Sequence, residues 1–120
     1  MPGRRKLFLA MICAEVEDSL EDVEFVSAEI ERRFRNNEVT NYVYSENEAL
    51  LAREASGLKK LIAFLQSVSP DDYESAADIA AFFEETLRNK VKELDNHQAV
   101  YEIIDRKIKK VLKYINESSC

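Results

Sequence analysis

The sequence LAMICAEVEDSLEDVEFVSAEIERRF, residues 9–34, decides the fold class of this chain. Along it, residues spaced alternately by four and three positions share one face of an α-helix. The positions on this face are Leu9, Cys13, Val16, Leu20, Val23, Ser27, Ile30 and Phe34. All of them except Ser27 are apolar, so the stretch predicts a long amphipathic helix that packs against other helices.

Signals for helix ends divide the rest of the chain. Asn36-Asn37 tolerates the left-handed backbone that ends a helix, and Ser45 and Glu48 have the spacing of a capping box. Ser69 followed by Pro70 is typical of a helix start, with serine as the cap and proline in the first turn. We therefore expect helices over residues 6–36, 46–68, 70–94 and 97–116, and a loop over residues 39–44.

The apolar stripe of the second half changes phase at Asp95-Asn96, although residues 72–116 hold neither glycine nor proline. A turn between two helices and a bend in one long helix both explain this change. Gly57 likewise marks either a close helix contact or a break in the second helix. A chain of 120 residues supports one domain, residues 1–120. The sequence thus predicts an all-α, antiparallel four-helix bundle with short connections.

Composition narrows the class and the compartment. With 46% hydrophobic residues the chain is too apolar to stay disordered, and its apolar run over residues 7–14 is too short to span a membrane. That run follows basic residues in the manner of a signal peptide, but its helical spacing continues into the next stretch. The two cysteines, Cys13 and Cys120, lie far apart in the sequence. We expect a reduced, cytoplasmic protein without a membrane partner.

Charge is distributed unevenly over a chain of net charge −6. Residues 14–31 carry eight acidic and no basic side chains, whereas the last predicted helix has a basic face of Arg106, Lys109, Lys110 and Lys113. In an up-and-down bundle the first and last helices are neighbours, so these charges attract each other. Nucleic-acid binding by the basic face is the alternative, and the acidic balance of the molecule argues against it.

An apolar segment indicates a protein partner. All of residues 76–83 except Asp78 are apolar, and together they cover every side of their helix. Phe25 lies among carboxylates, away from the apolar face of the first helix. A helix without a polar face is either central in its fold or shared with another chain. We expect a homodimer, or contact with another protein, through Phe25, Ala76, Ile79, Ala80, Phe82 and Phe83. Burial of these residues within a single chain is the alternative.

The expected function is that of a non-catalytic, acidic helical protein acting through protein–protein contacts. The alternative is a magnesium-dependent nucleotide pyrophosphohydrolase of the all-α type, because Glu21 with Glu24 and Glu102 with Asp105 place two carboxylates one turn apart. An acidic helix also produces such spacings by chance. With His97 as the only histidine, the sequence offers no histidine cluster, and we expect no cofactor.

Overall fold

The computed structural model describes residues 2–93 and 98–117, and within them every regular element is helical. The helices are α1 (Pro2–Arg35), α2 (Asn41–Ser67), α3 (Ala76–Glu93) and α4 (Gln98–Glu117), with a single 3₁₀ turn, η1 (Pro70–Asp72), before α3. The predicted all-helical fold with four helices is confirmed.

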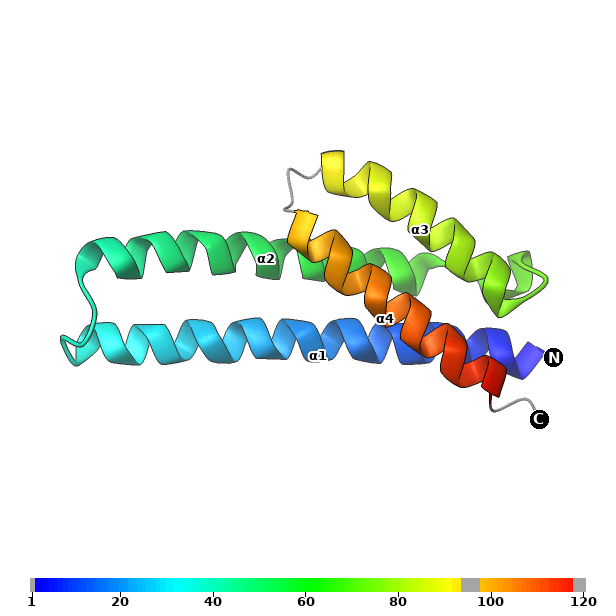
Figure 1. Cartoon of the computed structure of the whole chain (residues 1–120), viewed down its shortest axis with the longest axis horizontal. Coiled ribbons are helices and arrows are strands. Elements are labelled where there is room, and N and C mark those ends of the chain that lie inside the picture. Colours follow the sequence, from blue (N-terminus) through cyan, green and yellow to red (C-terminus); the bar gives the residue numbers. More distant parts are fainter. Residues whose placement is uncertain (1, 94–97, 118–120) are drawn as a thin grey trace.

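The helices form two antiparallel hairpins of unequal length. α1 and α2 make the long hairpin, and the shorter pair α3 and α4 lies across it near the two chain ends (Figure 1). The radius of gyration is 16.8 Å, against about 14 Å for a compact domain of this length, and the molecule measures 55 × 29 × 20 Å. The fold is therefore elongated, and the four helices lie together in only one half of it.

The hydrophobic core occupies the half where all four helices meet. It combines side chains of α1 and α2 with those of α3 and α4, and the largest fully buried ones include Phe8, Phe83, Ile79 and Ile108. The Phe8 and Phe83 rings stack with centroids 6.3 Å apart and join α1 to α3. Arg5 of α1 also donates a hydrogen bond to the backbone carbonyl of Tyr73, beside η1. The start of α1 is thus fixed by contacts distant in sequence.

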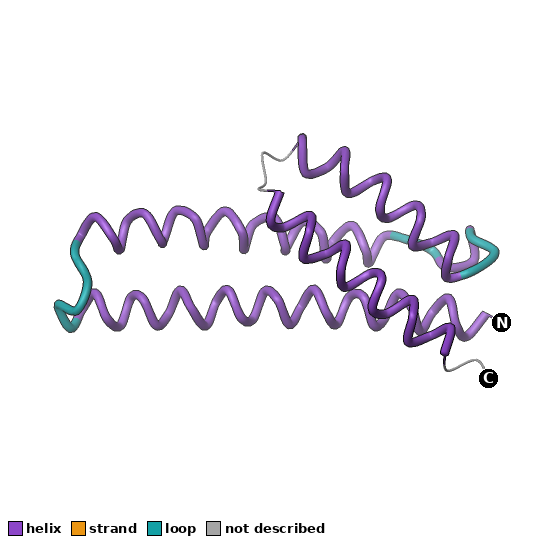
Figure 2. The backbone as a smooth tube through the Cα atoms, in the orientation of Figure 1, coloured by secondary structure: helices purple, strands orange, loops and turns teal. Residues whose placement is uncertain are grey.

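The other half of the long hairpin, residues 17–56, is called the arm here. None of its residues, all of which the structure describes, is buried. The Phe34 and Tyr44 rings stack near its tip with centroids 4.2 Å apart, and the Ser27 hydroxyl donates to the Glu48 carboxylate at 2.9 Å. The arm extends away from α3 and α4, and its connecting loop is at the far end (Figure 2). The arm is thus an antiparallel helix pair held together by contacts between α1 and α2.

The arm turns at a left-handed residue, as the sequence predicts. Asn37 has a φ of 61°, just beyond the end of α1. Its amide donates to the carbonyl of Phe34 at 3.1 Å, and the amide of Glu38 donates to the carbonyl of Arg33 at 2.8 Å. These two bonds form a Schellman motif, which satisfies the last carbonyls of the helix.

Three predicted helix starts are wrong. α1 begins at Pro2 instead of residue 6. α2 begins at Asn41 instead of residue 46, because the Thr40 hydroxyl accepts the Val43 amide at 3.2 Å and caps the helix earlier. Residues 41–44, expected to be loop, therefore belong to the helix. Pro70 starts only a 3₁₀ turn, and Ser69 makes no capping bond. Ser75 takes that role for α3, since its hydroxyl accepts the Asp78 amide at 3.2 Å.

Gly57 lies within an uninterrupted α2 and is buried, so of its two predicted roles the close helix contact fits and the break does not. α3 and α4 are separate helices, but Asp95-Asn96 and His97 lie outside the described residues.

Candidate functional site

The carboxylates that suggested a metal site are dispersed. Glu21, Glu24 and Glu102 are exposed, and Asp105 is partly buried and paired with Lys109 at 2.9 Å. In the described part of the chain, no three histidine, cysteine, aspartate or glutamate side chains are grouped so that they could hold a metal ion. The structure does not bring the two carboxylate pairs together.

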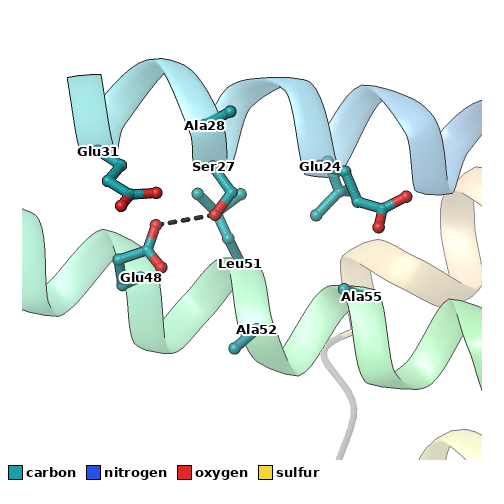
Figure 3. A pocket seen from close by; sticks show the side chains of 9 residues that line it. Glu24, Ser27, Ala28, Glu31, Glu48, Leu51, Ala52 and Ala55 are labelled. Carbon is teal, nitrogen blue, oxygen red and sulfur yellow. Dashed lines mark hydrogen bonds between the residues drawn. The ribbon is translucent and has the colours of Figure 1, made fainter. Parts of the chain in front are cut away.

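An open groove of about 280 Å³ runs along one side of the arm. Figure 3 shows Glu31 and Glu48 on opposite helices, with the Ser27 hydroxyl bonded to Glu48 and the Glu24 carboxylate farther along. The groove is lined by Val23, Glu24, Ser27, Ala28, Glu31, Glu48, Leu51, Ala52 and Ala55. Its lining contains no basic side chain and no side chain that is buried, so it lacks the enclosure of an ordinary ligand pocket.

Opposite charges meet between the first and last helices. The Glu15 carboxylate accepts the ammonium groups of Lys107 at 2.9 Å and Lys110 at 3.2 Å. These hydrogen bonds lower the pKa of Glu15 below its ordinary value, and the bond from Lys107 has the larger effect. Burial of the carboxylate raises the pKa, but by less. The expected attraction between the two helices is present, although Lys107 was not on the predicted basic face. Contacts of this kind stabilise the fold and occupy part of the surface considered for nucleic acid.

The apolar segment of α3 faces the core of its own chain. Ala76, Ile79, Ala80 and Phe83 are buried there. Phe82 is partly buried, with its ring 5.4 Å from that of Tyr73 and 6.1 Å from that of Phe64, measured between centroids. Phe25, on the arm, is 72% exposed. Of the residues expected to form a contact surface, the structure therefore leaves Phe25 accessible and separates it from the others.

Accessible apolar side chains gather on the arm instead. In the described residues, the large apolar side chains that are exposed are Leu7, Phe25, Val26, Tyr42, Val43, Leu50 and Tyr114, and five of these seven belong to the arm. Val26, Val43 and Leu50 are each more than 40% exposed. Exposed apolar side chains that cluster in one region mark contact surfaces more often than scattered ones do.

Sequence reasoning missed four of these five residues. Tyr42 and Val43 fall in the predicted loop, Leu50 lies on an apolar stripe of the second predicted helix, and Val26 is outside the predicted apolar face of the first helix. The lengths of the helices are the signal that could have identified these exposed residues. α1 has 34 residues and α2 has 27, whereas α3 has 18 and α4 has 20. At about 1.5 Å per residue, the shorter pair cannot cover the whole of the longer one.

Cys13 is partly buried, and its thiol lies 3.5 Å from the carboxylate of Glu17. Burial, followed by the hydrogen bond and charge of Glu17, raises the pKa of this thiol. A raised pKa keeps the sulfur protonated and disfavours nucleophilic chemistry. Cys120 lies outside the described residues.

No helix in the described part of the chain combines the length and the apolar character that crossing a membrane requires. Comparison of the chain with models of known protein families, with curated proteins and with solved structures finds no match.

Proposed function

We propose that this chain is a non-catalytic helical protein that acts through protein–protein contacts, with the arm as its contact surface. The observation that carries this proposal is the group of exposed apolar side chains on a part of the fold that buries none of its own residues. The opposite half contains the core that stabilises the molecule, and the arm extends from it.

The balance between core and surface supports this division of roles. A side chain such as Phe25 contributes little to folding while it is 72% exposed, whereas burying an aromatic side chain against a partner releases on the order of 2 kcal/mol. Tyr42 and Phe25 supply large, rigid contact area at a small cost in side-chain entropy, which is characteristic of residues that dominate interfaces.

The proposal is tested by photo-cross-linking. A benzophenone side chain replaces Phe25 or Tyr42 on the arm, and in a matched control it replaces Tyr114, an exposed aromatic residue on α4. We expect discrete adducts of defined mass from the arm positions in the cell of origin, and far fewer from the control position. Equal labelling from the three positions, or none from the arm, would contradict the proposal.

A further inference from the structure

The long hairpin presents the same apolar face twice. Val26 follows Phe8 by 18 residues, which is about five turns of an α-helix, so the two side chains have the same angular position on α1. Leu61 follows Val43 on α2 by the same number, and therefore shares its angular position there. Phe8 and Leu61 are buried, with 0% and 7% of their surface exposed, whereas Val26 and Val43 are exposed by 43% and 41%.

The difference between the two halves is what lies over them. In the core half this face packs against the shorter hairpin, as the ion pairs of Glu15 with α4 show. In Figure 1, α4 crosses the long hairpin in that half, and no described helix lies over the arm. We call the uncovered continuation the open face. It carries Val26 and Ile30 of α1 with Val43 and Leu50 of α2.

Charges along α1 complement themselves when a second copy is turned end for end. Residues 17–24 hold five acidic side chains and no basic one, whereas residues 32–35 hold three arginines. Asp22 and Arg33 lie four residues before and seven residues after Val26, so both border the open face on its side of the helix. An antiparallel α1–α1 contact centred near residue 28 places each Asp22 opposite Arg33 of the partner copy. The Arg33 guanidinium also lies 3.3 Å from Glu29 of its own helix, so it would be shared between the two carboxylates.

Shape selects the same orientation. If two copies met with their tips at the same end, the shorter hairpin of each would occupy the space needed by the other, because both lie on the face that is to be joined. With the tips at opposite ends, each arm fills the place beside the other's shorter hairpin. Two helices of the second copy then cover the face of each arm, just as α3 and α4 cover the same face in the core half.

We infer that the occupant of the open face is a second copy of this chain, turned end for end, with α1 packed on α1 and α2 on α2. This inference rests on the proposed function of the arm as a contact surface. The open face is about 24 Å long and two helices wide, a footprint of about 500 Å² per chain. Since stable interfaces bury about 800 Å² per partner, the dimer dissociates on dilution.

Sedimentation equilibrium over a range of protein concentrations tests the inference. We expect twice the mass of one chain at high concentration. Val26→Glu buries two carboxylates in each dimer and raises the dissociation constant by more than roughly a hundredfold. Because Val26 is exposed in the single chain, the variant keeps its helical circular dichroism and its melting temperature at concentrations where the wild type is monomeric.

The orientation is tested by exchanging charges. Asp22→Arg and Arg33→Asp each create like-charge contacts and raise the dissociation constant, while the double variant restores it because both contacts regain opposite charges. Glu21→Arg is the matched control: Glu21 is exposed and adjacent in sequence, but it lies on the far side of α1 from the open face and leaves the dissociation constant unchanged.

A wild-type chain that stays monomeric, a Val26→Glu variant that stays dimeric, or a double variant that fails to restore the dimer overturns the inference. If the chain is monomeric but still forms cross-links from Phe25 or Tyr42 to a different protein, the inference that a second copy occupies the open face is refuted. The proposed function then remains intact. A monomeric chain without such cross-links overturns both.

Discussion

Glu15 on α1 and Lys107 on α4 lie 92 positions apart in the sequence and form an ion pair of 2.9 Å. Both side chains are less than a quarter exposed, and Lys110 adds a second contact to the same carboxylate. This pair joins the most acidic helix of the chain to its most basic one, next to the core. The contribution of this ion pair to the free energy of unfolding can be measured by varying the pH and by substituting Glu15.

The Glu15→Gln substitution is expected to lower the free energy of unfolding at neutral pH by roughly 1 kcal/mol, the scale of a well-formed but partly exposed ion pair. Because the folded-state pKa of Glu15 is lowered, its stabilisation is fully present above the ordinary carboxyl value of 4.5 and is lost as the pH falls below it. Urea titrations at several pH values measure the effect. The difference between the wild type and the variant should shrink in acid, and the exposed Glu21→Gln control should show neither change.

Phe82→Glu should unfold the chain or destabilise it by about 3 kcal/mol or more, because the new carboxylate would be placed among Phe64, Tyr73 and Phe83. Ala81→Glu is the control, on the same helix but exposed, and should remain close to the wild type in thermal melting. If Phe82→Glu instead gave a folded monomer from a dimeric wild type, α3 would be a shared surface and its burial within one chain would be refuted.

Asn37→Gly should raise the free energy of unfolding by about 0.5–1 kcal/mol. Asn37 has a left-handed φ of 61°, which glycine adopts without steric cost. The neighbouring Asn36→Gly is the matched control, since Asn36 does not have a positive φ and glycine there only adds freedom to the unfolded chain. Chemical denaturation of both variants checks the prediction, and a stabilising Asn36→Gly would contradict it.

Magnesium should leave the melting temperature of the protein unchanged. Converging carboxylates repel one another when empty, so a metal that fills such a site stabilises the folded state. Glu21 and Glu24 are exposed on the arm, and Asp105 is paired with Lys109 on α4. Differential scanning calorimetry with and without magnesium is the measurement. A clear rise in melting temperature would restore the hydrolase hypothesis, which calcium and sodium controls would then refine.

The helical class and the long first helix are predictable from sequence because they depend on local periodicity. The predicted end of that helix at residue 36 is within one position of the observed Arg35. The start of α2 is not predictable in this way. Its first turn contains Tyr42, Val43 and Tyr44, which favour strands in isolation. Stacking of Tyr44 on Phe34 brings this turn against α1, and that contact joins different helices.

The orientation of α3 is beyond sequence reasoning for a related reason. Seven of the eight residues 76–83 are apolar and they cover all sides of the helix, so periodicity does not distinguish an inward face from an outward one. Phe64 on α2 and Tyr73 beside η1 decide it, because their rings cover Phe82. The accessible surface therefore follows from helix lengths and tertiary contacts, and Phe25 is the one residue of that surface that the sequence identified.

The repeat of one face along the long hairpin has a consequence for how this fold can vary. The arm buries no residue, and only its base touches the core. The length of the arm can therefore change without disturbing the core. Removing or adding matched segments of about two turns from both helices would shift the tip by about 10 Å while keeping the seam in register. Insertions and deletions should therefore be tolerated when they occur in pairs, one on α1 and one on α2. A single insertion or deletion in one helix should destabilise the arm.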